Sequence, residues 1–168
     1  MHVLLTKVSD QRHRVEVIRA DGTREKLELE TRSFLVHDFV HYAVESLAGM
    51  TTGFFGMLAA GAPLQQLNDR SATWDPDSQI GLAESIVGPM QDVIKGLADA
   101  KSLISGLDEL FSATGMHRPA WVNAAFVDQV EAEFKRLSGA WRATPYSGQL
   151  LLVWPAPKVK PVQAQKWT

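Results

Sequence analysis

Cysteine is absent from this 168-residue chain. Its absence excludes a disulfide framework, a thiolate metal site and catalysis by a cysteine nucleophile. A strong charge of one sign is also lacking, because 17 Lys and Arg residues stand against 19 Asp and Glu residues and leave a net charge of −2. Such a chain has no overall field to attract a polyanion, so we expect no nucleic-acid partner.

Long hydrophobic runs are scarce as well. Near the N-terminus only three consecutive apolar residues precede Thr6 and Lys7, which is too short for the apolar region of a secretory signal. The longest weakly charged stretch, residues 39–64, contains His41 and Glu45, whereas a membrane-spanning helix needs about 20 apolar residues. We therefore expect a cytoplasmic protein that does not associate with a membrane.

Familiar nucleotide-binding and catalytic motifs are missing too. The sequence contains no Walker A pattern, no G-x-G-x-x-G loop and no G-x-S-x-G elbow that would expose a serine nucleophile. What is present is ordinary for a globular protein, with 45% hydrophobic and 21% charged residues. The length predicts a single domain over residues 1–157, followed by a flexible tail over residues 158–168.

Two alternating runs around Asp21-Gly22 predict a β-hairpin. A three-residue loop over residues 20–22, with Gly22 in the left-handed conformation, pairs Val15 with Leu27 on an apolar face. On the other face the same register pairs opposite charges, Arg14 with Glu28 and Glu16 with Lys26.

The two ends of the chain supply the remaining strands. Residues 1–8 precede the hairpin as the first strand of a meander. Residues 149–154 form an apolar run of strand length, which must join that sheet because a lone strand leaves its backbone groups unpaired. The sequence therefore predicts a four-stranded antiparallel sheet, built from three N-terminal strands and one C-terminal strand.

Between these strands the apolar period changes from two to about 3.6, which indicates helices. Four are expected: residues 33–48 ending at Gly49, residues 51–61 capped by Thr51 or Thr52, residues 86–111, and residues from Pro119 toward Trp141. A layer of helices over one face of the sheet places the protein in the α+β class.

The first of these helices carries an ionisable cluster in the segment HDFVHYAVE. At about 100° per residue, His37, His41 and Glu45 fall within one arc of about 80°, with Asp38 on its edge. Two imidazoles four residues apart can ligate one divalent metal ion, and Glu45 is a candidate third ligand one turn further along. We treat Asp38 as a candidate ligand-binding residue. Because Asp38 stands where the H-E-x-x-H pattern has glutamate, a zinc protease of that class is excluded.

A polar surface stripe explains the same cluster without any ligand. Asp38 would then be favoured by the helix dipole in the first turn, while the histidines and Glu45 would be solvated or paired with groups of the sheet or loops. A small pocket beneath the loop over residues 63–79 would favour the ligand-binding hypothesis.

HDFVHYAVE is followed by GFFGMLAAG, and the chain later carries the segment WRATPYSGQLLLVWP. These segments resemble a family of small bacterial proteins of uncharacterised function, whose patterns are H-D-L-V-H-Y/F-x-V-E and G-F-x-G-x-x-A-A-G. The matching positions are His37, Asp38, His41, Glu45, Gly53, Phe54 and Gly56. The resemblance implies a stand-alone cytoplasmic bacterial domain and no particular activity, cofactor or catalytic residue.

Two hypotheses for function follow. In the first, the polar stripe of the first helix binds a divalent metal ion or another small ligand. In the second, the chain is a non-enzymatic interaction module, most simply a homodimer, that uses an apolar stripe of heptad-like spacing on the helix over 86–111, kinked near its start at Gly88-Pro89. Packing of that stripe within one chain would produce the same spacing.

Overall fold

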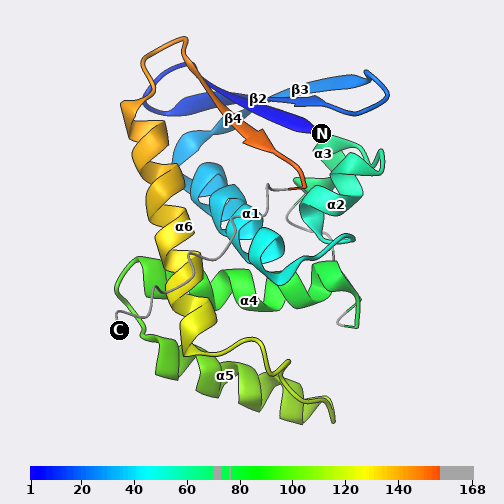
Figure 1. Cartoon of the computed structure of the whole chain (residues 1–168), viewed down its shortest axis with the longest axis vertical. Helices are drawn as coiled ribbons and strands as arrows, with labels where there is room; N and C mark the ends of the chain where they lie inside the picture. The colour runs from blue at the N-terminus through cyan, green and yellow to red at the C-terminus, as the bar shows by residue number, and fades with distance from the viewer. Residues whose placement is uncertain (70–72, 76, 156–168) are drawn as a thin grey trace, which may run out of the picture.

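The computed structural model describes residues 1–69, 73–75 and 77–155, and the predicted tail over 158–168 lies outside these ranges. Within the described residues one antiparallel sheet has the strand order β3-β2-β1-β4 (Figure 1). Its strands are β1 (His2–Lys7), β2 (Arg12–Ile18), β3 (Arg24–Glu30) and β4 (Gln149–Val153). Because β4 pairs with β1, the predicted four-stranded sheet is confirmed.

The hairpin between β2 and β3 has the predicted register. Val15 pairs with Leu27, and the opposite charges of Glu16 and Lys26 lie across from each other. Gly22 adopts a φ of +84°, the left-handed conformation that the three-residue loop requires. Side-chain alternation and turn chemistry were therefore sufficient to set this register.

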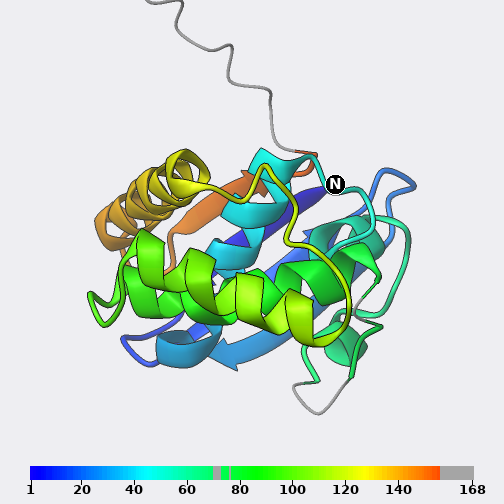
Figure 2. The ribbon, with the colours of Figure 1, turned by 90° about the horizontal axis from the view of Figure 1, so that it is seen from below.

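The helices all lie on one face of the sheet, as Figures 1 and 2 show. They are the π-helical turn η1 (Thr31–Leu35) and the helices α1 (Val36–Ala48), α2 (Phe54–Ala59), α3 (Leu64–Leu67), α4 (Gln79–Ile94), α5 (Ala100–Ala113) and α6 (Ala124–Ala143). In Figure 1, α1 lies beneath the sheet, α4 beneath α1 and α5 beneath α4, while α6 runs along one side of this stack. The α+β class is thus confirmed.

Helix α1 is the centre of the molecule, because an apolar core lies on each side of it. Phe39 and Tyr42 face the sheet, α2 and α3, where the first core contains Leu5 and Val17. The second core, which includes Val40, Ala43 and Val44 of α1, is shared with α4, α5 and α6. The alternative of a polar surface stripe on this helix is therefore wrong, because residues Asp38 to Glu45 are all buried.

The predicted long helix over 86–111 is two helices. Gly96 has a φ of +72° and ends α4, and Asp99 then caps α5 by accepting a hydrogen bond from the Ser102 backbone N–H at 2.8 Å. Pro89, the predicted kink near the helix start, lies well inside α4, which begins ten residues earlier at Gln79. The members of the predicted stripe that lie in the second core are Ile86, Met90, Val93, Leu107 and Phe111.

Two further helix starts differ from the prediction. The residue before α2 is Gly53, whereas the backbone N–H groups of Thr51 and Thr52 donate to the Gln79 side chain, each at 2.7 Å. Helix α6 starts at Ala124, because the Asn123 side chain accepts a hydrogen bond from a backbone N–H in its first turn. Among the helices of the described residues, none is long and apolar enough to cross a membrane.

Candidate metal centre

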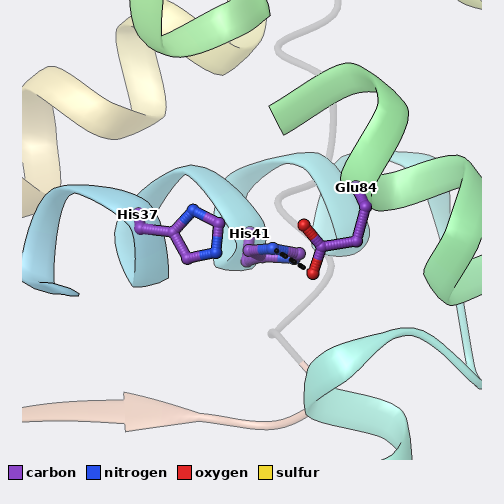
Figure 3. Close-up of side chains that lie close together, drawn as sticks. All are labelled: His37, His41 and Glu84. Carbon is purple, nitrogen blue, oxygen red and sulfur yellow. Dashed lines mark ion pairs between the residues drawn. The ribbon is translucent and has the colours of Figure 1, made fainter. Parts of the chain in front are cut away.

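Three side chains that can bind a metal ion converge between α1 and α4 (Figure 3). His37 and His41 lie one turn apart on α1, with ring centroids separated by 4.6 Å, and Glu84 reaches toward them from α4. One ligand atom from each residue lies within 4.8 Å of the other two. The predicted histidine pair is therefore joined by a carboxylate from a different helix.

His41 is the most deeply buried member of this cluster, with 1% of its surface exposed. Its Nδ1 lies 3.0 Å from Glu45 Oε1, and its Nε2 lies 3.3 Å from Glu84 Oε1. The second contact is close enough for an ion pair but is not oriented for a hydrogen bond, so His41 Nε2 has no hydrogen-bond partner among the described residues. This nitrogen points toward Glu84 (Figure 3).

The two carboxylates control the protonation of His41. Burial lowers the pKa of this imidazole, but its close contacts with Glu45 and Glu84 and the negative charges of both carboxylates outweigh burial and raise the pKa to about 9. The pKa of Glu84 is lowered, because its interactions with His41 and the charge of His37 outweigh the effect of its own burial. The site therefore attracts positive charge at the position of His41 Nε2.

Glu45, a predicted metal ligand, lies on the opposite side of His41 from Glu84. It is fully buried and accepts hydrogen bonds from the backbone N–H groups of Phe54 and Phe55, at 2.9 and 3.0 Å. These donors belong to the first turn of α2, whose uncompensated N–H groups favour a carboxylate. A Cβ at Gly53 would lie 2.5 Å from the Glu45 carboxyl carbon, so the absence of a side chain there permits this approach.

Glu45 therefore holds the ring of His41 and is not one of the three clustered residues. Its carboxylate accepts a hydrogen bond from His41 Nδ1–H. This bond orients the ring so that Nε2 faces Glu84. The other predicted residue, Asp38, is buried in α1 and also lies outside the cluster.

His37 occupies the outer end of the cluster. Its Nδ1 lies 3.0 Å from the amide nitrogen of Gln91, which comes from the same face of α4 as Glu84. His37 and Glu84 are partly exposed, whereas His41 is enclosed. The cluster thus has a buried inner end and an outer end that ligands can reach.

A cavity of about 580 Å³ lies against this outer end. His37, Glu84 and Gln91 are part of its wall. Leu67, Asn68, Asp69 and Trp74 also line it, so a pocket of the kind that would favour the ligand-binding hypothesis lies beside the segment over 63–79. Part of that loop, residues 70–72 and 76, lies outside the described residues.

Sequence reasoning missed Glu84, although a weak signal for it exists. The positions 80, 84, 87 and 91 are separated by four, three and four residues. Glu84 and Gln91 therefore lie on the same face of the helix as the buried Ile80 and Val87. Two polar residues in phase with a buried face indicate a polar contact inside the protein. The same signal does not identify the partner helix.

Comparisons of the chain with protein-family models, with curated proteins and with solved structures find no match. The resemblance to a family of small bacterial proteins therefore stays an expectation from the sequence.

Proposed function

We propose that the protein binds a divalent transition-metal ion between His37, His41 and Glu84. The observation that carries this proposal is the buried Nε2 of His41, which faces a carboxylate without a hydrogen bond to it. At 3.3 Å the Glu84 carboxylate can satisfy this nitrogen only as an ion pair, which requires a protonated imidazole. A metal ion bound at this position would use the Nε2 lone pair and satisfy the Glu84 carboxylate at the same time.

The donor set suits such an ion. Two imidazoles and one carboxylate are typical ligands of Zn²⁺ at sites that keep a position open, and of other divalent transition metals. The 3.3 Å between His41 Nε2 and Glu84 Oε1 is close to the separation of two ligands on one ion, about 3.4 Å for tetrahedral bonds of about 2.1 Å. The ligand atom of His37 lies within 4.8 Å of the other two, so a movement of this side chain toward them would complete the set.

The residues around the cluster support this arrangement. The contact of Glu45 with His41 Nδ1 is the carboxylate–histidine interaction that commonly orients a metal-binding imidazole. Gln91 can do the same for His37, since its amide can turn its oxygen toward an Nδ1 proton when Nε2 binds an ion. Without an ion, a proton on His41 Nε2 occupies the same place between the ring and Glu84, so proton and metal compete.

Calorimetric titration with Zn²⁺ tests the proposal on protein first treated with a chelator. We expect about one ion per chain, and binding weakened by more than about 100-fold in His37→Ala and Glu84→Gln, because each removes a direct ligand. His117→Ala is the matched control, since His117 is exposed and lies outside the cluster. Wild-type protein without saturable binding, or Glu84→Gln with unchanged binding, would overturn the proposal.

The homodimer stays an untested alternative, because packing within one chain already accounts for the stripe that suggested it. The apolar stripe between Ile86 and Phe111 is divided between two helices, and its buried members pack against α1 and α6 of the same chain. Leu97, at the break between the helices, is 75% exposed and isolated from that core. The spacing is therefore explained by packing within one chain.

A further inference from the structure

We infer that the cavity beside the cluster binds a small organic anion, whose carboxylate or phosphate group ligates the metal ion and whose apolar body lies against the cavity wall. This inference rests on the proposed metal site and names the class of ligand for it. Three features of the described residues carry it: the position of the cavity, the composition of its wall and its charge.

The cavity gives access to the outer side of the cluster only. His37 and Glu84 line it, whereas His41 lies behind them and is 1% exposed. With three protein ligands, a divalent ion keeps at least one further coordination position. Because His41 and the protein interior occupy the inner side, that position faces the cavity. A ligand held in the cavity can therefore bind the ion directly.

The wall of the cavity has an apolar and aromatic part beside its polar and charged residues. Its apolar members are Phe34, Val36, Phe54, Leu67 and Trp74. A volume of about 580 Å³ lies within the range of about 300–1,000 Å³ that small-molecule sites occupy. The wall therefore favours a ligand with an aromatic or aliphatic body over a bare inorganic ion.

The charges of the wall favour an anion once the metal ion is bound. Arg32 and Lys95 contribute two positive charges, and Asp69 and Glu84 contribute two negative charges. These balance, and protonated His41 balances Glu45. Because a divalent ion replaces the His41 proton, metal binding leaves the site with one uncompensated positive charge. Arg32 and Lys95 are at the exposed rim of the cavity, where they can contact an anionic group from the solvent side.

The test uses protein loaded with Co²⁺, whose visible absorption changes when a new ligand enters its coordination shell. Benzoate and phenyl phosphate are the anionic probes, acetate lacks the apolar body, and benzyl alcohol lacks the charge. We expect a saturable spectral change with at least one anionic probe, weaker binding of acetate and no change with benzyl alcohol.

Arg32→Gln and Lys95→Gln should each weaken binding of the anionic probe roughly 3- to 10-fold and leave Co²⁺ binding unchanged, since neither residue is a ligand. Lys101→Gln is the matched control, because Lys101 is exposed on α5 and does not line the cavity.

The outcomes separate this inference from the proposed function. If Co²⁺ binds but neither anion changes its spectrum, the organic anion is wrong and the metal site stands. Equal binding of acetate and benzoate would show that an apolar body is not recognised. Equal binding of the anionic probe by Arg32→Gln, Lys95→Gln and Lys101→Gln would overturn the role of Arg32 and Lys95. If Co²⁺ itself does not bind, the proposed function is wrong.

Discussion

Two carboxylates touch the two nitrogens of His41, and we predict opposite effects when each becomes an amide. Glu45→Gln should destabilise the fold strongly, whereas Glu84→Gln should leave the fold nearly intact and abolish metal binding. The contrast follows from their surroundings: Glu45 is fully buried, and the Glu84 side chain is 35% exposed.

The magnitude for Glu45 comes from its three hydrogen bonds. Oε1 accepts from His41 Nδ1 and from the Phe54 N–H, and Oε2 accepts from the Phe55 N–H. A glutamine has only one acceptor oxygen, so its NH₂ group must face at least one of these donors. Losing a buried bond to a charged acceptor, with the donor left unsatisfied, costs about 2–4 kcal/mol.

Glu84 has less to lose in the absence of metal. Its contact with His41 is an ion pair without hydrogen-bond geometry, and the side chain is partly screened by solvent. We therefore expect Glu84→Gln to change the free energy of unfolding by about 1 kcal/mol or less.

Urea unfolding in the presence of a chelator measures both effects, with tryptophan fluorescence or circular dichroism as the signal. For Glu45→Gln we also expect a thermal midpoint lower by roughly 5–15 °C, and Zn²⁺ binding weakened by about 10- to 100-fold, because the ligands stay but His41 is less well oriented. A Glu45→Gln protein within about 0.5 kcal/mol of wild type, or equal destabilisation by both variants, would refute the roles assigned here.

Two further predictions concern the stability of the fold. Burial is the largest influence on His13 and lowers its pKa from 6.5 to about 4. Between these two pH values the unfolded chain binds more protons than the folded chain. The free energy of unfolding should therefore fall as the pH falls from 6.5 toward 4, with a loss of about 2 kcal/mol near pH 5. His13→Leu should remove this loss in urea unfolding followed from pH 7 to pH 5, and an unchanged pH profile would contradict the assignment. Gly53→Ala should destabilise by about 1–3 kcal/mol, because its Cβ would lie 2.5 Å from a buried carboxyl carbon. At Gly106, inside α5, a Cβ would have no atom within 4 Å, so Gly106→Ala should instead stabilise the fold by about 0.5–1 kcal/mol. Similar thermal midpoints for the two glycine variants would argue against the close contact at Gly53.

The sheet could be predicted because its determinants are local. Alternation of apolar and charged residues decides which face of β2 and β3 is buried, and Gly22 decides the length of the loop between them. Even the long-range pairing of β4 with β1 followed from a general requirement, that an apolar strand needs a partner for its backbone groups.

The helices were harder to predict because apolar spacing does not show where one helix stops. The stripe from Ile86 to Phe111 continues in phase across Gly96, although the chain there takes a left-handed turn and α5 starts anew at Asp99. Gly96 and the capping residue Asp99 were the local signals for this break. In the same way, Asn123 was a better indicator of the start of α6 than Pro119.

The spacing of His37, His41 and Glu45 is enough to place them on one side of a helix, because four residues make about one helical turn. What lies on that side depends on packing between elements: α4 brings Glu84 to His41 Nε2, and α2 brings two backbone N–H groups to Glu45. Helical periodicity describes one element, whereas these contacts depend on how three elements pack around two cores. For that reason a stripe that is typical of a solvated surface became a cluster around the buried His41, in which Glu84 and not Glu45 joins the two histidines.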